Sequence, residues 1–347
     1  MGCNVFTSLK KGSFNSKMLN LNFIEGEFSI DGKKHSIKYV NTNRNSVYRT
    51  KSLFTKEPTT IPWLEAMEKD SIFVDIGANV GMYSIYAAVV SGAKVYSFEP
   101  ESQNYAEINK NIFLNNLHGR VLAYSLALGN ENKVSKLHLS RFVQGSSEHD
   151  FDENWRATAP MGTAPTREDA GLTQGCVSVR LDDLIANGSI PMPNHIKIDI
   201  DGFEGKVIEG AMETLKRPEL KSILIETDFR IPDSVKIIKI MEDLGWKYSY
   251  DQVCTNRKNK LTPEQLRNHI KKQIGGTNFI YYKDERYAKI FKDFAKDFVP
   301  PSPKNPKDIA AAAIAAEAAA KKKVVTVNFS QKLRNIFNTQ VRKTAKK

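Results

Sequence analysis

A strand that runs directly into a glycine-containing turn and then into a helix constrains this chain more than any other feature. Residues 74–84 read VDIGANVGMYS, with an apolar start typical of a buried strand and helical spacing of apolar residues from about residue 79. Glycine at positions 77 and 81 lets the backbone turn tightly and approach a ligand closely. Such a unit predicts an α/β fold that binds its ligand at the carboxyl ends of the strands.

The same alternation of strand and helix continues along the chain. We expect strands at residues 72–76, 94–98, 120–127, 136–140, 176–180, 195–200, 222–226, 247–250 and 279–282, and helices at 79–90, 101–116, 181–186, 205–215, 234–244 and 263–273. Repeated units of this kind predict a doubly wound α/β fold with a mostly parallel central sheet. A β-hairpin within residues 23–54, turning at Asp31-Gly32, and a short helix at 63–69 that Pro62 opens are expected to precede it.

Composition divides the chain into three parts. Residues 1–70 hold a loose polar leader, the hairpin and the short helix. Residues 71–299 form the main domain, and their segment 141–175 is rich in Gly, Ser, Thr and Pro. That segment is too long for a simple connection, which indicates a lid or an insertion. Residues 300–347 begin with PPSP and continue with an alanine run and three lysines, so we expect a basic tail that is helical or disordered.

Positive charge is concentrated in the tail. The chain has a formal net charge of +12, and residues 300–347 alone hold 11 Lys/Arg and 2 Asp/Glu. The rest of the chain is nearly neutral, which argues against a nucleic-acid enzyme because such enzymes carry basic charge around the active site. Apolar residues at 329, 333, 337 and 341 recur at helical spacing among basic residues. The tail is therefore expected to be either a solvated segment or a helix that binds an anionic membrane surface or a partner.

Cysteine usage and hydropathy indicate the compartment. Three widely spaced cysteines exclude a disulfide framework and a cysteine zinc site. The sequence has no run of 18 apolar residues and no signal-peptide pattern. These observations predict a cytoplasmic protein, peripheral to a membrane if the tail binds one.

An acidic residue at the end of the second strand suggests what the glycine turn binds. Glu99 follows strand 94–98, where a carboxylate can accept hydrogen bonds from two ribose hydroxyls. A dinucleotide site needs G-x-G-x-x-G, but Asn79 stands at the middle glycine, and Asp75 would repel a pyrophosphate. A carboxylate suits the ammonium group of a methionine moiety, so the pattern favours S-adenosylmethionine. The alternative is a strand–helix turn that binds no ligand.

Several segments together resemble the FkbM family of methyltransferases. They read DIGANVG at 75–81 with FEP at 98–100, VRLDDL at 179–184, IKIDIDGFE at 196–204 and LIE at 224–226, and the resemblance covers roughly residues 60–285. It implies a Rossmann-like methyltransferase fold and an O-methyltransferase that uses S-adenosylmethionine to modify a hydroxyl of a sugar, glycan or related metabolite. The cofactor is then expected against Asp75, Gly77, Ala78, Asn79, Gly81, Tyr83, Glu99 and Pro100. The segment 141–175 and the basic tail depart from the family pattern.

A hydroxyl acceptor needs a base to take its proton, and that base should stand at the carboxyl end of a strand. Asp199 and Glu204 are the expected catalytic residues by this criterion. Each has a structural alternative: Asp199 could bind the loop after its strand, and Glu204 could complement the N-terminus of the following helix. His149, in the segment 141–175, is expected on the surface, although a lid could bring it into the site as a base.

Four carboxylates could meet at neighbouring strand ends, where they could hold Mg²⁺ or Ca²⁺. They are those of Asp199, Asp201, Glu226 and Asp228. Their adjacency is an inference from the strand pattern, so we assign no metal site.

Two other functions stay open at this stage. The first is a nucleic-acid methyltransferase, although the chain lacks the Asn/Asp-Pro-Pro-aromatic loop of base-amino enzymes and a Pro-Cys nucleophile. The second is a non-catalytic methyltransferase fold recruited through its basic tail. The expected partner is a hydroxyl-bearing sugar or glycan substrate, and the sequence indicates no oligomeric state.

Overall fold

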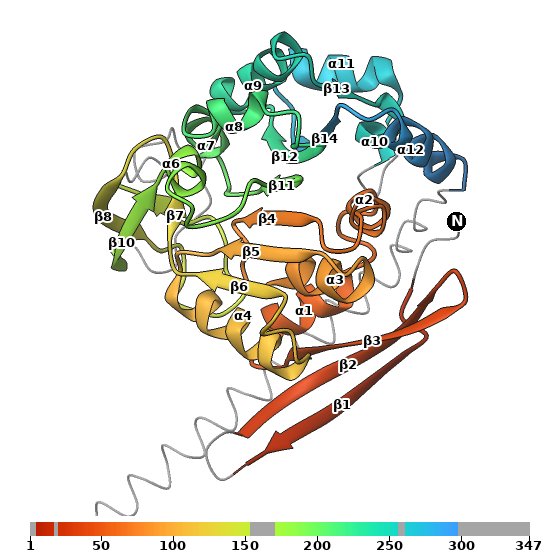
Figure 1. Ribbon diagram of the computed structural model, residues 1–347, viewed down its shortest axis with the longest axis vertical. Coiled ribbons are helices and arrows are strands. Elements are labelled where there is room, and N and C mark those ends of the chain that lie inside the picture. Colours follow the sequence, from red (N-terminus) through yellow and green to blue (C-terminus); the bar gives the residue numbers. More distant parts are fainter. Residues whose placement is uncertain (1–4, 17–19, 153–170, 256–260, 298–347) are drawn as a thin grey trace, which may run out of the picture. The chain divides into compact units, whose positions relative to one another are not determined.

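A computed structural model describes residues 5–16, 20–152, 171–255 and 261–297 (Figure 1). Residues Met1–Val299 form one compact unit, to which every element below belongs. The expectations for the tail at 300–347, and for residues 153–170 of the segment 141–175, lie outside the described residues. Among the described residues, no helix has the length and apolarity needed to cross a bilayer.

A seven-stranded sheet forms the centre of this unit. Its strands, in spatial order, are β13 (Lys247–Tyr248), β14 (Gly276–Tyr282), β12 (Ser222–Asp228), β11 (His195–Ile198), β4 (Ile72–Ile76), β5 (Lys94–Phe98) and β6 (Val121–Tyr124). Figure 1 shows β11, β4, β5 and β6 side by side in this order. The strands from β12 to β6 pair in parallel, and β14 runs antiparallel to both of its neighbours. The predicted doubly wound α/β fold with a mostly parallel sheet is confirmed.

Two hydrophobic cores lie on the two faces of this sheet, because successive side chains of a strand point to opposite faces. Phe73, for example, packs in one core and Val74 in the other. The first core also takes side chains from α2 (Thr60–Glu65), α3 (Met82–Val90), α4 (Ser102–Leu114) and α12 (Arg286–Asp297). The second takes them from α6 (Leu181–Ala186), α7 (Glu204–Glu209), α8 (Met212–Lys216), α9 (Pro232–Asp243), α10 (Tyr250–Thr255) and α11 (Pro263–Lys271). Burial on both faces explains why the central strands are so apolar.

The N-terminal region is more ordered than its sequence predicts. The expected hairpin is confirmed as β2 (Asn20–Ile30) and β3 (Lys33–Val40), with Asp31 and Gly32 both at positive φ in the turn. The expected loose leader is wrong for residues 8–15, which form β1 (Ser8–Asn15) and pair antiparallel with β2. Most β1 side chains are exposed, so the strand depends on backbone hydrogen bonds that leave no apolar period in the sequence.

Two short helices connect this N-terminal sheet to β4. The first, α1 (Arg44–Ser52), was not expected; its N-cap is Asn43, whose side chain accepts hydrogen bonds from the backbone N–H groups of Asn45 and Ser46. The second, α2, spans 60–65 rather than the predicted 63–69. Helix α1 contacts β3, and its Ser46 hydroxyl donates a hydrogen bond of 2.5 Å to Glu107 of α4, so α1 lies against the main domain.

A second, four-stranded sheet has the order β7-β10-β8-β9, and its strands are β7 (Ala127–Leu128), β8 (Lys133–His138), β9 (Asp150–Phe151) and β10 (Thr173–Val179). The predicted strand 120–127 is therefore two strands in two sheets, and 176–180 belongs to this sheet rather than to the central one. The predicted helix 205–215 is also broken, into α7 and α8. A Cβ atom at Gly210, between them, would overlap the carbonyl oxygen of Gly129, so the break is where these two loops touch.

Candidate active site

A cavity of about 390 Å³ opens at the carboxyl ends of β4, β5, β11 and β12. Four of the residues expected to bind the cofactor line it: Gly77, Asn79, Glu99 and Pro100. The expected Asp75, Ala78, Gly81 and Tyr83 are not among the described residues of its wall. The glycine turn and the acid after the second strand are thus brought together as the sequence predicted.

The glycine turn packs directly against the end of β11. Gly77 has a φ of +76° and donates its N–H to the carbonyl oxygen of Phe98 at 2.9 Å. A Cβ atom at this position would overlap the backbone carbonyl oxygen of Asp199. Only glycine fits here, because both the positive φ and the approach of a second strand exclude a side chain. The turn therefore places the backbones of β4 and β11 in contact at the cavity.

Glu99 stands where β5 ends, and its carboxylate faces both the protein backbone and the cavity. Its Oε2 accepts a hydrogen bond from the Asn79 N–H at 2.7 Å, and its Oε1 accepts one from the Glu101 N–H at 2.9 Å. The side chain of Asn104 also forms a hydrogen bond with this carboxylate, whose remaining acceptor capacity is available at the cavity. Burial raises the pKa of Glu99 to about 7, against the opposing effect of these hydrogen bonds. Beside it, Phe98, Leu126 and Leu128 form an apolar part of the wall.

A buried lysine, Lys197, forms ion pairs with two carboxylates behind the cavity wall. Lys197 Nζ lies 2.7 Å from Asp199 Oδ2 and 3.9 Å from Asp75 Oδ1. Although burial favours the neutral amine, these two carboxylates hold the pKa of Lys197 above its ordinary value. Asp75 also accepts a hydrogen bond of 2.5 Å from Ser84 of α3. The carboxylate expected to meet an ammonium group of the cofactor is thus directed toward α3 and Lys197, behind the cavity wall.

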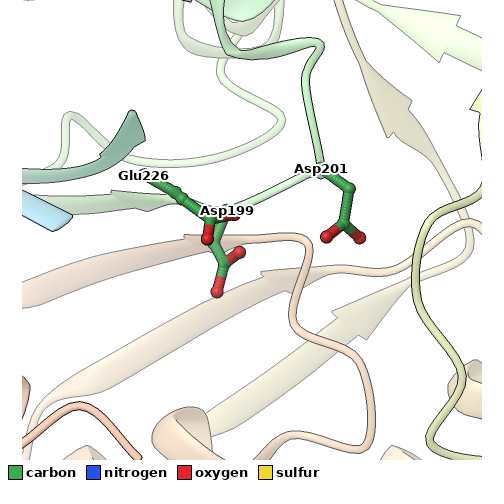
Figure 2. A group of neighbouring side chains, drawn as sticks. All are labelled: Asp199, Asp201 and Glu226. Carbon is green, nitrogen blue, oxygen red and sulfur yellow. The ribbon is translucent and has the colours of Figure 1, made fainter. Parts of the chain in front are cut away.

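Three carboxylates come together in the wall of the cavity (Figure 2). Asp199, Asp201 and Glu226 each offer one oxygen within 4.8 Å of the others, a grouping that could hold a metal ion. Burial and the negative charges of Asp199 and Asp201 raise the pKa of Glu226 well above its ordinary value. Asp199 shifts the opposite way: burial would raise its pKa, but Lys197 and Lys56 lower it below the ordinary value. The two environments therefore separate the pKa values of this pair, favouring the ionised form of Asp199 and the protonated form of Glu226.

Glu204 lies outside the described lining of the cavity. It is 1% exposed, and its Oε1 accepts hydrogen bonds from the N–H groups of Ile200 and Gly202. Burial raises the pKa of Glu204 to about 7. Among the described residues that line the cavity it is absent. Glu204, the first residue of α7, thus supports the loop after β11, and its catalytic role stays a prediction.

Several residues of the wall were not predicted from the sequence. Tyr48, Arg49 and Lys56 reach the cavity from the segment before β4, and no spacing in the sequence connects them to the glycine turn. His149 lines the cavity and is half-buried, so the expectation of a surface position is wrong. Its Nδ1 accepts the Ser140 N–H at 3.1 Å, which leaves the proton of a neutral ring on Nε2. Ser146 and Ser147 also line the cavity, so the described start of the segment 141–175 borders the site.

Comparison with known proteins identifies what this site resembles. The family profile described as the methyltransferase FkbM domain matches residues 75–248, about half of the chain. The hexuronic acid methyltransferase AglP of Haloferax volcanii is 22% identical over 231 residues, which are 67% of this chain and 83% of that protein. The 31-O-demethyl-FK506 methyltransferase FkbM of Streptomyces tacrolimicus is 26% identical over 178 residues, 47% of this chain and 67% of that protein.

A solved structure of a methyltransferase FkbM from Methylobacillus flagellatus is similar at a TM-score of 0.38 and 14% identity. The alignment covers 68% of this chain and 51% of that one, so this chain spans about half its length.

Proposed function

This chain belongs to the methyltransferase FkbM domain family, and from that premise we propose that it methylates a hydroxyl oxygen of a sugar, glycan or related metabolite with S-adenosylmethionine. One observation carries the proposal. The carboxylate of Glu99, held by two backbone N–H groups, faces the cavity next to the glycine turn. This arrangement suits the two hydroxyls of a ribose, each of which needs an acceptor.

The residues present fit S-adenosylmethionine. Glu99 would accept the ribose hydroxyls, and Phe98, Leu126 and Leu128 would cover the apolar faces of the adenine. The turn at Gly77 and Asn79 would lie along the sugar and the methionine part. Bound there, the cofactor would supply a methyl group on a positively charged sulfur. The protein's own contribution is to exclude water and to orient a nucleophilic oxygen toward that methyl group.

The acceptor hydroxyl needs a group that takes its proton. We assign this role to Asp199, which is at the cavity, ionised at neutral pH and held in one orientation by Lys197 at 2.7 Å. Glu226, whose pKa burial and the charge of Asp199 raise, lies beside it. Environments that separate the pKa values of two neighbouring carboxyl groups are typical of acid and base roles in one site.

The two named relatives support an oxygen acceptor. One is named for a hexuronic acid and the other for 31-O-demethyl-FK506. Both compounds bear hydroxyl groups, which is why we propose hydroxyl-bearing sugars, glycans and related metabolites as the class to test.

Turnover of a labelled methyl donor with a panel of glycans and uronic acids tests this function. Asp199→Asn keeps the shape of the side chain but removes a proton acceptor, so kcat should fall by about 10²- to 10⁴-fold. Affinity for S-adenosylmethionine, measured by isothermal titration, should survive in the same variant. Near-normal turnover would exclude Asp199 as the base. Failure of the unsubstituted chain to bind S-adenosylmethionine would instead favour a non-catalytic fold.

A further inference from the structure

Within the described part of the chain, Arg49 is a cation of the cavity wall that forms no ion pair. Three basic side chains line the cavity: Arg49, Lys56 and Lys206. Lys56 forms an ion pair of 2.7 Å with Glu57. Lys206, on α7, lies over the ring of Phe203 and acts electrostatically on Asp152 of the second sheet. Arg49 has no ion pair with any carboxylate in the described part of the chain, which makes it the cation with charge to offer a ligand.

The position of Arg49 relates it to the glycine turn. Its Nε donates a hydrogen bond of 3.0 Å to the carbonyl oxygen of Gly145. The next residue, Ser146, accepts a hydrogen bond of 2.6 Å from the side chain of Asn79, whose N–H is bound to Glu99. Arg49 is thus tied, through two consecutive residues, to the turn beside the ribose-binding carboxylate. The bond at Nε fixes the side chain and leaves both terminal nitrogens of the guanidinium for a ligand.

The electrostatic surroundings place Arg49 near the start of α3. Burial and the negative charges of Glu57 and Asp199 raise the pKa of Tyr83 well above its ordinary value, and Arg49 opposes this shift. Arg49 also acts against the charge of Lys56, which Glu57 and Asp199 stabilise. Arg49 therefore acts electrostatically on Tyr83, in the first turn of α3, as Asp199 does with the opposite sign.

We propose that Arg49 binds the methionine carboxylate of S-adenosylmethionine, as a cofactor-binding residue that lies outside the matched domain. The inference rests on the proposed function. A carboxylate in a partly buried cavity needs a charged partner, and the planar fork of an arginine matches its two oxygens. Only a short chain of atoms joins the ribose to the amino-acid end of the cofactor, so that end must lie on the same stretch of wall as the turn.

Two ligands that differ only in the amino-acid end test the assignment without any turnover. S-Adenosylhomocysteine carries the carboxylate, whereas 5′-methylthioadenosine keeps the nucleoside and sulfur but lacks the amino-acid end. In isothermal titration of the full chain, Arg49→Gln should weaken S-adenosylhomocysteine by about 10- to 100-fold. Its affinity for 5′-methylthioadenosine should stay within about twofold, which also shows that the nucleoside site is folded. Arg49→Lys keeps the positive charge but not the planar guanidinium, so it should lose less affinity for S-adenosylhomocysteine than Arg49→Gln does.

Arg44→Gln is the matched control, because Arg44 is exposed on the same helix. It should change neither affinity. An equal loss of both ligands in Arg49→Gln would show that Arg49 only supports the loop at Gly145 and would overturn the inference. Unchanged affinity of Arg49→Gln for both ligands would also overturn the inference. This holds even if the KM of that variant for an acidic acceptor rises. If the unsubstituted chain binds neither ligand, the proposed function fails and this inference with it.

Discussion

Two buried glutamates with a pKa of about 7 have different positions in this site, and the difference separates the proposed ligand-binding residue from the proposed structural one. Glu99 faces the cavity, whereas Glu204 faces the backbone of the loop after β11. Burial is the largest cause of both pKa shifts, so the pKa values alone do not distinguish the two roles. The two roles are distinguished by the groups that each carboxylate contacts.

Cofactor affinity should depend on the ionisation of Glu99. In the proposed function the ionised carboxylate accepts two ribose hydroxyls, and its pKa of about 7 means that acid adds a competing proton. Affinity for S-adenosylmethionine should therefore fall as the pH decreases from 8 to 6, by up to about tenfold per pH unit below the pKa. Isothermal titration in two buffers of different ionisation enthalpy should detect proton release on binding. In Glu99→Gln the affinity should be lower at pH 8 and this pH dependence should disappear; a wild-type affinity that is constant over this range would contradict the role.

Glu204 should tolerate a neutral replacement. Glu204→Gln keeps one oxygen for the Ile200 and Gly202 N–H groups, so kcat should be nearly unchanged. Because the folded pKa of Glu204 is raised from 4.5 to about 7, its contribution to stability is fully present below pH 4.5 and is lost as the pH rises through 7. The melting temperature of Glu204→Gln, relative to wild type, should thus improve between pH 5 and pH 8. Glu204→Ala should lose about 1–3 kcal/mol, since two N–H groups lose their acceptor. A large loss of kcat in Glu204→Gln, with normal stability, would restore the catalytic role.

The predicted site residues that line the cavity include those whose position the backbone alone determines. Gly77 and Glu99 follow strands directly, and a residue just after a parallel strand must lie at the carboxyl edge of the sheet. Asp75 lies inside its strand, so whether its side chain meets the cavity or the helix behind depends on packing. Arg49 could not be predicted, because the contact that places it, with Gly145, spans 96 residues and has no signature.

At the scale of whole elements, the turn between β4 and α3 depends on its contact with β11. Gly77→Ala should weaken cofactor binding and lower the melting temperature, because the new methyl group would overlap the Asp199 carbonyl in addition to straining the backbone. Gly32→Ala is the matched control: Gly32 has a similar φ of +79°, but nothing lies within 4 Å of its Cβ position. It should cost about 1 kcal/mol and leave binding intact. Equal effects of the two substitutions in differential scanning fluorimetry would show that the contact with β11 is unimportant.

The elements predicted best are those buried on both faces. Strands β4, β5 and β11 are short apolar runs. Such runs are typical of parallel strands that are covered on both faces of the sheet in an α/β domain. Helix α1 gave no signal because the residues it buries are Ser46, Thr50 and Ser52. Helix α12 was missed although its spacing was readable: Tyr287, Phe291 and Phe294 recur every three or four residues and are buried.

At the scale of the whole molecule, charge and cofactor binding are separable. The compact unit ends at Val299, and residues 300–347 carry 11 of the 51 Lys/Arg residues with 2 Asp/Glu. Deletion of residues 300–347 should leave affinity for S-adenosylmethionine unchanged. It should abolish salt-sensitive sedimentation with anionic vesicles, since each basic residue near such a surface contributes about 1 kcal/mol. Neutral vesicles are the control, and a full-length protein that ignores anionic vesicles at low ionic strength would contradict a membrane role.

The contact between Gly77 and the end of β11 has a consequence for synthesis. More than a hundred residues separate the two strands in the sequence, yet they are direct neighbours in the sheet. A growing polypeptide that has left the ribosome as far as β6 already contains the whole glycine motif and the acid that follows it. It still lacks the strand that closes one side of the turn, since non-local pairing must wait for the later segment. The proposed nucleoside pocket can therefore form only late in translation, and truncated chains that end before β11 should bind no cofactor.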